Sequence, residues 1–217
     1  MAHINSPKMT FPRSWPFALA AACLLAGCQS DNNPGTRPAP APAPVAVTLP
    51  APAAPQSAAA PAVPRERKVI RIKAGSADSF TDSSGNVWLP DQGFADGDTV
   101  DRAADLPISN TKDPALYRSE RYSMSAFSYQ LPNGNYTVKL HFAETFEDIN
   151  APGLRVFSFK VQGREFNDFD VFAKAGGAQK AYIEIVPIEV TNGKLEIGFA
   201  SKAENPEING IEIFPEP

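Results

Sequence analysis

The chain has 217 residues and is acidic, with 20 basic and 24 acidic side chains and a formal net charge of −4. It contains no basic cluster that could neutralise phosphates, so a function in nucleic-acid binding is not expected. The sequence also lacks a Gly-rich phosphate-binding loop and a Gly-x-Ser-x-Gly motif, which argues against the common nucleotide-dependent enzymes and serine hydrolases.

Residues 1–27 have the features of an export signal. Lys8 and Arg13 precede the uncharged stretch PFALAAACLLAG, which is too short to cross a bilayer as a helix. The stretch ends in LAGC, which resembles the lipobox of bacterial lipoproteins, where the cysteine is acylated and becomes the new N-terminus. This resemblance implies removal of residues 1–27 and lipidation of Cys28. The alternative is a plain signal peptide that ends near a cysteine.

The remaining chain would then have no free thiol, because Cys23 lies in the removed segment and Cys28 is acylated. Without Lys8 and Arg13 the basic residues fall from 20 to 18 against 24 acidic ones, a net charge of −6. By resemblance to lipoproteins, Gln29 in place of an aspartate favours the outer membrane of a Gram-negative cell. We therefore expect an exported protein that is lipid-anchored to the cell envelope.

Residues 28–67 comprise this lipidated N-terminus and an Ala/Pro-rich linker. Alternating Ala-Pro cannot build a hydrophobic core and favours an extended polyproline II conformation. At ~3.1 Å per residue, a fully extended segment of this length would reach about 120 Å. The linker is therefore expected to act as a spacer that holds a folded domain away from the lipid surface.

Residues 68–217 form one domain with the period-2 alternation of β-strands. Asn133-Gly134 separates two alternating runs, which predicts a β-hairpin between residues 127–131 and 136–142. Pro187 interrupts its run, so that strand is expected at a sheet edge or at a bulge. The strands expected in chain order are VIRIKA, FSYQL, YTVKLHF, VFSFKV, AYIEIVPIEV, LEIGF and INGIEIF. These predict an all-β fold, an antiparallel β-sandwich or jelly roll.

Catalytic and metal-binding patterns are weak. His141 is the only histidine outside the leader, and its place on the polar face of a strand predicts an ordinary surface residue. Asp168 and Asp170 are too few oxygen ligands to indicate a calcium site. Carboxylates are plentiful, so a glycosidase-like pair remains open, because such a pair depends on its separation across a cleft. We expect no metal, no cofactor and no catalytic residue.

The segment LYRSERY, residues 116–122, belongs to a series of motifs that follow one another along residues 71–213. Together the motifs resemble the malectin family, a jelly-roll carbohydrate-binding fold, over about 140 residues, a domain-sized match. The matching stretches are RIKAGS, FTDSSGNVWLPDQGF, LYRSERY, FSYQLPNGNYTVKLHFAE, RVFSFKVQG, DFDVFAKAGG, GKLEIGF and NPEINGIEI. The leader and the linker lie outside this resemblance.

The resemblance also implies a binding site. In the animal members the sugar pocket is formed by four aromatic residues and an acid, and the matching positions here are Arg102, Tyr122, Phe146, Glu147 and Glu204. Two of the four aromatic positions stay aromatic, and the acid is longer by one methylene. The animal ligand, a glucosylated N-glycan, therefore does not carry over.

The residues alone also favour a sugar site, because a pyranose has apolar faces and a rim of hydroxyl groups that suit aromatic rings and fixed polar groups. The ordinary alternative is that the aromatic rings pack the mouth of the sandwich. Glu120, Arg121 and Glu144 recur in the family motifs and are expected to form a structural pairing that holds the loop to the strand; the alternative is that one of them contacts the ligand. The candidate ligand-binding residues are Tyr122, Phe146, Glu204, Tyr117, Arg102 and Glu147.

The sequence therefore predicts a non-catalytic carbohydrate-binding module that is displayed on the cell envelope as a lipoprotein. Its partners would be a glycan or oligosaccharide and, through the lipid, the membrane. Two alternatives remain. The same fold serves in plant receptor ectodomains that recognise peptides and proteins, and a glycoside hydrolase would need two carboxylates that converge in the pocket.

Overall fold

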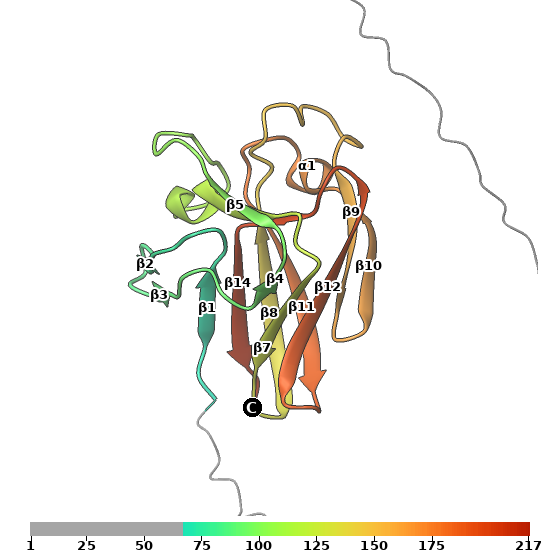
Figure 1. Ribbon diagram of the computed structural model, residues 1–217. Coiled ribbons are helices and arrows are strands. Elements are labelled where there is room, and N and C mark those ends of the chain that lie inside the picture. The colour runs from blue at the N-terminus through green and yellow to red at the C-terminus, as the bar shows by residue number, and fades with distance from the viewer. Residues whose placement is uncertain (1–66) are drawn as a thin grey trace, which may run out of the picture. The chain divides into compact units, whose positions relative to one another are not determined.

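The computed structural model describes residues 67–217. The predicted signal peptide, the proposed lipidation site at Cys28 and nearly all of the predicted linker lie outside these residues. Within residues 67–217, no helix is long and apolar enough to cross a membrane. Figure 1 shows two packed sheets with additional short strands and loops beside them and at one end of the sandwich.

The two main sheets are antiparallel throughout, as the sequence predicts. The four-stranded sheet has the order β1 (Ile70–Lys73), β14 (Gly210–Pro215), β8 (Gly134–Phe142) and β11 (Tyr182–Val190). The five-stranded sheet has the order β10 (Arg164–Phe169), β9 (Val156–Val161), β12 (Lys194–Ala203), β7 (Ala126–Gln130) and β4 (Phe94–Ala95). The fold is thus an all-β sandwich, and β11 with Pro187 is an edge strand, as expected.

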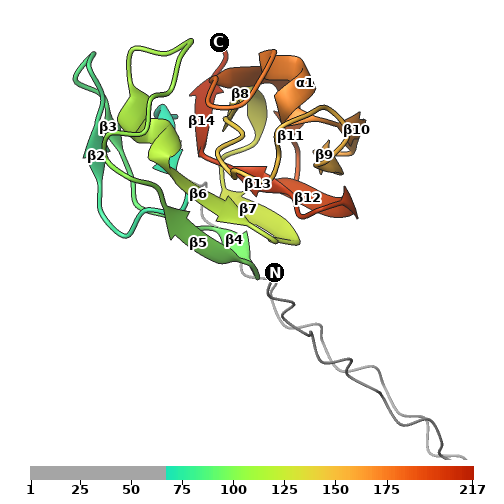
Figure 2. The same cartoon turned by 90° about the horizontal axis from the view of Figure 1, so that it is seen from above.

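Smaller elements surround these sheets. A three-stranded sheet has the order β13 (Glu207–Ile208), β6 (Ser119–Tyr122) and β5 (Asp98–Asp101). A two-stranded sheet contains β2 (Phe80–Thr81) and β3 (Val87–Trp88), and the two helical segments within residues 67–217 are the 3₁₀ helix η1 (Pro114–Arg118) and α1 (Val171–Ala175). Seen from above, β5, β6 and β13 cross one end of the sandwich (Figure 2). These three strands carry part of the candidate site.

The core lies between the two main sheets, where alternate side chains of each strand meet. In β8, Tyr136, Val138, Leu140 and Phe142 are at most 1% exposed, which confirms the alternation predicted for this run. Phe142 packs against the aromatic rings of neighbouring strands, including Phe157 at 6.2 Å and Phe169 at 5.0 Å between ring centroids. Burial of this apolar surface is the main stabilising contribution to the sandwich.

The predicted hairpin at Asn133-Gly134 is wrong. β7 pairs with β12 and β4, whereas β8 pairs with β14 and β11, so this turn carries the chain from one sheet to the other. The connection from β11 to β12 makes a similar crossing beside it, and Asn133 links the two: its Nδ2 donates to the carbonyl of Thr191 at 3.0 Å and its Oδ1 accepts from the amide of Gly193 at 2.8 Å. A tight turn reverses the chain but does not decide which strand becomes the partner.

His141 is buried, contrary to the expectation that it lies at the surface. It is 4% exposed, because β3 and η1 cover this part of the outer face of the four-stranded sheet. Its Nδ1 is 2.8 Å from the hydroxyl of Tyr117, its Nε2 is 3.0 Å from Oε1 of Glu212, and the Trp88 ring meets it edge-on. Glu212 in turn accepts from Nε of Arg71 at 2.8 Å. This chain of polar contacts joins a second, smaller hydrophobic cluster to the sheet. The buried members of this cluster are Trp88, Ile108, Leu116, Tyr117, Ala143 and Ala181.

The chain enters the described domain at the end of the sandwich where β7 and β8 are joined. Arg67 lies 6.0 Å from the ring centroid of Tyr136, near the beginning of β8. The loops that follow β8 at Phe142 and β12 at Ala203 lie at the opposite end (Figure 1). The candidate site is at this second end.

Candidate functional site

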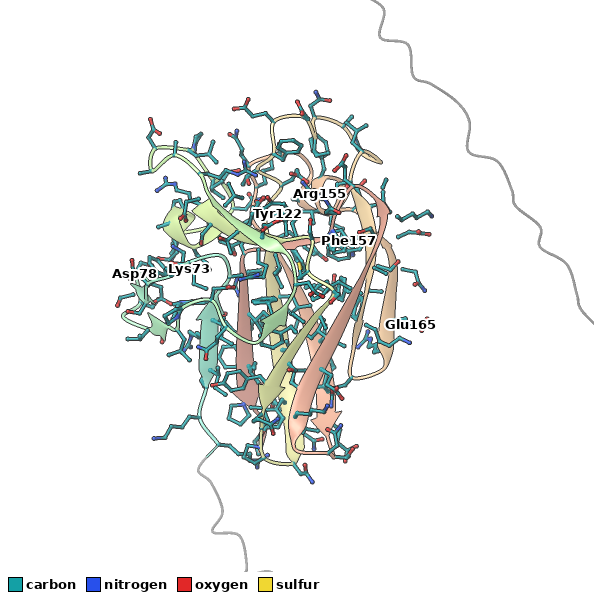
Figure 3. All side chains as sticks on the ribbon, in the orientation of Figure 1. Lys73, Asp78, Tyr122, Arg155, Phe157 and Glu165 are labelled. Carbon is teal, nitrogen blue, oxygen red and sulfur yellow. The ribbon has the colours of Figure 1, made fainter. Side chains whose placement is uncertain are left out.

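A cavity of about 290 Å³ opens at the end of the sandwich opposite Arg67. Its walls come from β5, β6, the loop after β8, the residue before β9 and the segment after β12. Figure 3 shows Tyr122 and Arg155 at this end of the domain. The lining residues are Val100, Arg102, Glu120, Tyr122, Phe146, Arg155, Glu204 and Asn205.

Two glycines let β6 approach its neighbours closely enough to form this wall. Gly97 (φ 77°) lies against the carbonyl of Tyr122, and Gly75 (φ 77°) lies against the backbone of Glu120. Both φ values fall in the left-handed region that favours glycine, and at both positions a Cβ would collide with backbone atoms. The positions of Glu120 and Tyr122 therefore depend on these two residues.

Left-handed backbone also occurs at non-glycine residues beside the cavity. Ser123 directly follows Tyr122 and has φ 59°, while Glu204 lines the cavity and has φ 58°. Such conformations cost free energy in residues with a Cβ and are often found at functional sites. The amide of Ser123 donates to the carbonyl of Pro206 at 2.9 Å, which joins the two segments.

Arg102 is held in a closed ring of hydrogen bonds. Its Nη2 donates to Oε1 of Glu120 at 2.8 Å and its Nε donates to Oγ1 of Thr145 at 3.0 Å. The Thr145 hydroxyl completes the ring by donating to Oε2 of Glu120 at 2.6 Å. Both oxygens of Glu120 are thus engaged, and the guanidinium of Arg102 is fixed in the cavity wall.

Arg155 is fixed in a similar way on the other side. Its Nε donates to Oε2 of Glu144 at 2.7 Å and its Nη1 donates to the carbonyl of Asn205 at 2.6 Å. The other oxygen of Glu144 accepts from the amide of Phe146 at 3.0 Å, which orients the loop that carries this aromatic ring. Burial raises the pKa of Glu144, and the positive charge of Arg155 opposes that shift.

Glu207 adds a third buried carboxyl to this cluster. It is 1% exposed, and neither carboxyl oxygen has a hydrogen-bond partner within residues 67–217. Burial, and then the nearby carboxylates of Glu120 and Glu144, raise the pKa of Glu207 well above its ordinary value. With Glu207 protonated, the two remaining carboxylates balance the two guanidinium groups of Arg102 and Arg155.

A second cavity, of about 380 Å³, adjoins the first. Arg102 and Phe146 line both cavities and so form the boundary between them. Phe146 is 36% exposed and directly follows Thr145 in the loop after β8. The other residues that line the second cavity are Ala103, Leu106, Thr145, Glu147 and Asp148.

The structure brings together four of the six candidate ligand-binding residues in the first cavity: Tyr122, Phe146, Glu204 and Arg102. Glu147 lines the second cavity instead. Tyr117 does not belong to the site. Its side chain is 2% exposed and its hydroxyl is bound to His141, because η1 turns it into the small hydrophobic cluster with Trp88.

The ion pairs expected from the family motifs are present. Arg121 binds the carboxylate of Asp91 and the carbonyls of Asp96 and Gly97, so it ties β6 to the preceding loops. Glu120 and Glu144 bind Arg102 and Arg155 as described above. Arg155 and Asn205 were not anticipated from the sequence. A buried acid in the FAE motif requires a cationic partner, and Arg155 could have been sought on that ground.

The two acids of the DFD motif do not form a joint site. Asp168 has φ 54° at an irregularity of β10, and its Oδ1 accepts from Nζ of Lys202 at 2.6 Å. Asp170 caps α1, where its Oδ1 accepts from the amide of Ala173 at 2.9 Å. Within residues 67–217 no group of three or more histidine, cysteine or acidic side chains is placed to hold a metal ion.

The Malectin domain model matches residues 68–211. The chain belongs to the malectin domain family. Human malectin is 35% identical over 108 residues, and malectin-B of Xenopus laevis is 37% identical over 108 residues; each match covers 45% of this chain. A probable leucine-rich repeat receptor-like serine/threonine-protein kinase of Arabidopsis thaliana is 39% identical over 132 residues, or 56% of this chain.

This malectin-family chain spans only a part of those relatives: 36% of human malectin, 38% of the Xenopus protein and 13% of the plant kinase. Solved structures show the same fold. A β-glucuronidase of Bacteroides uniformis matches with a TM-score of 0.63 and 23% identity over 69% of this chain and 18% of its own. The extracellular domain of ANXUR2 from Arabidopsis thaliana matches with a TM-score of 0.60 and 19% identity over 67% of this chain and 48% of its own.

Proposed function

We propose that residues 68–217 are a non-catalytic carbohydrate-binding domain, exported and displayed on the cell envelope by a lipid on Cys28. The observation that carries the binding function is the meeting of Tyr122 and Phe146 in one cavity with two immobilised arginines and the carboxylate of Glu204. These side chains come from segments far apart in the sequence, and Tyr122, Phe146, Arg102 and Glu204 occupy positions implied by the resemblance to animal malectins.

The chemistry of the cavity suits a polyhydroxylated ligand. Aromatic rings can stack on the apolar C–H face of a pyranose, while guanidinium groups donate to its hydroxyl oxygens and Glu204 accepts from its hydroxyl hydrogens. Arg102 and Arg155 are held by charge-assisted hydrogen bonds before any ligand arrives. Binding would therefore cost little side-chain ordering.

The carboxylates of the cavity argue against a glycoside hydrolase. Such an enzyme needs one carboxyl group as acid and a second as base or nucleophile. Glu120 has both oxygens engaged by Arg102 and Thr145, which leaves Glu204 as the only lining carboxylate without a partner within residues 67–217. A pair of available carboxylates is thus not assembled in this cavity.

The decisive test is a glycan array probed with the purified chain, followed by competition with the free sugar. A signal that the free sugar removes supports carbohydrate binding. Capture of a protein partner without sugar competition would instead favour the alternative of a protein-interaction module. Turnover of a chromogenic glycoside that is lost in Glu204→Gln would show that the domain is a hydrolase.

The lipid anchor is a separate part of the proposal and rests on the LAGC motif after an uncharged run. Replacement of Cys28 by serine removes the proposed site of acylation. Because stable anchoring requires more than one acyl chain, the protein should be released from the membrane fraction or remain as an unprocessed precursor. A fully processed Cys28→Ser protein that stays with the membrane would contradict the assignment. Fractionation of inner and outer membranes would test the expected location.

A further inference from the structure

The charged groups around the two cavities are not balanced. Arg102 is paired with Glu120 and Arg155 with Glu144, at 2.8 and 2.7 Å. Three further carboxylates line the cavities, namely Glu204 in the first and Glu147 and Asp148 in the second. All three are exposed, and none has a hydrogen-bond or ion-pair partner within residues 67–217. The free charge at the site is therefore negative.

Apart from Arg102 and Arg155, no cation of the described domain lines either cavity. Arg118 reaches the loop beside the second cavity, where its Nε donates to the carbonyl of Leu106 at 2.9 Å, but Asp105 precedes Leu106 in the same loop. Each of the two cavities that Phe146 lines thus also has at least one of the three free carboxylates in its lining.

Aromatic faces beside carboxylates are a chemical environment that favours ammonium groups. The negative face of an aromatic ring attracts a cation, and nearby carboxylates add Coulomb attraction and hydrogen-bond acceptors. Phe146 is 36% exposed and lines both cavities, the first together with Glu204 and the second together with Glu147 and Asp148. A carboxylate-bearing ligand would meet like charges at the same positions, and this disfavours acidic saccharides.

We propose that the site selects saccharides that carry a free amino group, with the ammonium held by Glu147 and Asp148 near Phe146 and the sugar ring placed against Tyr122. This inference rests on the proposed carbohydrate-binding function and narrows its ligand class. It assigns a role to Glu147, which occupies a position where the animal family members have an aromatic residue. The second cavity then contributes the charge selectivity and the first contributes the stacking surface.

The test uses four β-1,4-linked disaccharides that differ in charge: cellobiose, the glucosamine disaccharide, its N-acetylated form, and a disaccharide of glucuronate and glucose. Calorimetric titration of the purified full chain should give an affinity for the glucosamine disaccharide roughly tenfold higher than for cellobiose, with the uronate weakest. The preference should shrink at high salt and at a pH where the amine is neutral.

The variant Glu147→Gln/Asp148→Asn removes both charges at nearly constant volume and should abolish the preference, so that the glucosamine disaccharide binds no more tightly than cellobiose. The matched control is Glu165→Gln, which removes an exposed acid on β10. A preference for cellobiose or for the uronate, an amine preference that survives in the double variant, or failure of the amine form to bind would overturn the inference. If cellobiose or the uronate is preferred, or if the amine preference survives in the double variant, the proposed carbohydrate binding still stands. A glycan array without any signal that free sugar removes would instead refute the proposed function.

Discussion

Glu207 lies directly opposite Tyr122 in the pairing of β13 with β6. One of these residues is a fully buried carboxyl without a hydrogen-bond partner in the described domain, and the other lines the first cavity. The ionisation of Glu207 therefore affects the same strand pair that positions the pocket. Its effect on stability can be measured by titration.

The first prediction concerns Glu207→Gln. Because the pKa of Glu207 is raised on folding, the folded state keeps a proton that the unfolded chain releases near the ordinary value of 4.5. The contribution of this group to stability is therefore highest below that value. It falls by about 1.4 kcal/mol for each pH unit between the unfolded and the folded pKa. Glu207→Gln should lose this dependence.

The measurement is the difference in melting temperature between Glu207→Gln and the parent from about pH 5 to about pH 8. The variant should gain relative to the parent as pH rises. Glu144, whose pKa is also raised, interacts with Glu207, so the difference reports the loss of Glu207 together with its effect on the titration of Glu144. A difference that is flat over this range would show that Glu207 is ionised in the folded state or has a partner there.

The second prediction concerns stacking. If a sugar ring contacts Tyr122 and Phe146, replacement of either by alanine should remove about 1–2 kcal/mol of binding free energy, the scale of burying an aromatic face. This corresponds to roughly a tenfold loss in affinity. The matched control is Tyr182→Ala on β11, which should leave the affinity of folded protein unchanged. Parent-like affinity in both Tyr122→Ala and Phe146→Ala would place the ligand elsewhere.

The third prediction concerns Tyr117, which lies outside the cavities. Tyr117→Phe removes the hydroxyl that contacts Nδ1 of His141 and leaves that nitrogen buried without this partner. We expect a loss of about 1–3 kcal/mol in the free energy of unfolding and no change in ligand affinity. Chemical denaturation and calorimetric titration of the same variant separate the two effects. A large loss of affinity with unchanged stability would restore Tyr117 to the site.

The fourth prediction concerns the buried pair of Arg155 and Glu144, whose side chains are 6% and 1% exposed. Arg155→Met leaves the Glu144 carboxylate without its cation and should cost about 3–5 kcal/mol of stability. Glu144→Gln in the same chain removes the stranded charge and should restore part of the loss. If the double variant is no more stable than Arg155→Met alone, the pair is not the source of the effect.

The fifth prediction concerns Gly97. A Cβ at this residue would collide with the carbonyl of Tyr122, and its φ of 77° is unfavourable for alanine. Gly97→Ala should therefore destabilise the domain by more than ~1 kcal/mol and weaken ligand binding, because it displaces β6. Gly153→Ala is the control, since it also has positive φ but has no atom within 4 Å of the added Cβ. Equal effects of both variants would mean that backbone strain alone is responsible.

Much of this fold follows from the alternation of apolar residues. The run from Tyr136 to Phe142 buries every second side chain, and such runs give both the strands and the inward faces. Strand partners do not follow in the same way. Asn133-Gly134 is a strong local turn signal. Whether the chain then continues in the same sheet or crosses to the other sheet depends on how the inward faces of the two sheets pack into one core, and the turn residues do not encode this.

Part of the candidate site could be predicted from the sequence, because several of its residues belong to recognisable motifs. Tyr122, Phe146 and Glu204 occupy positions in motifs whose order is characteristic of the family, so their convergence in one cavity could be anticipated. Tyr117 and His141 could not be placed, because their burial depends on η1 and β3 covering one face of a sheet. A cationic partner for the buried acid Glu144 could be expected from the sequence, but only the structure identifies that partner as Arg155.

The position of Arg67 relative to the cavities has a mechanical consequence. The chain enters at one end of the sandwich and the cavities open at the other, so tension between a bound ligand and the N-terminal segment would run along the strands. β1 would be pulled lengthwise against β14, which loads its four residue pairs together instead of one after another. Tension in this direction would therefore load the edge strand β1 in shear along β14.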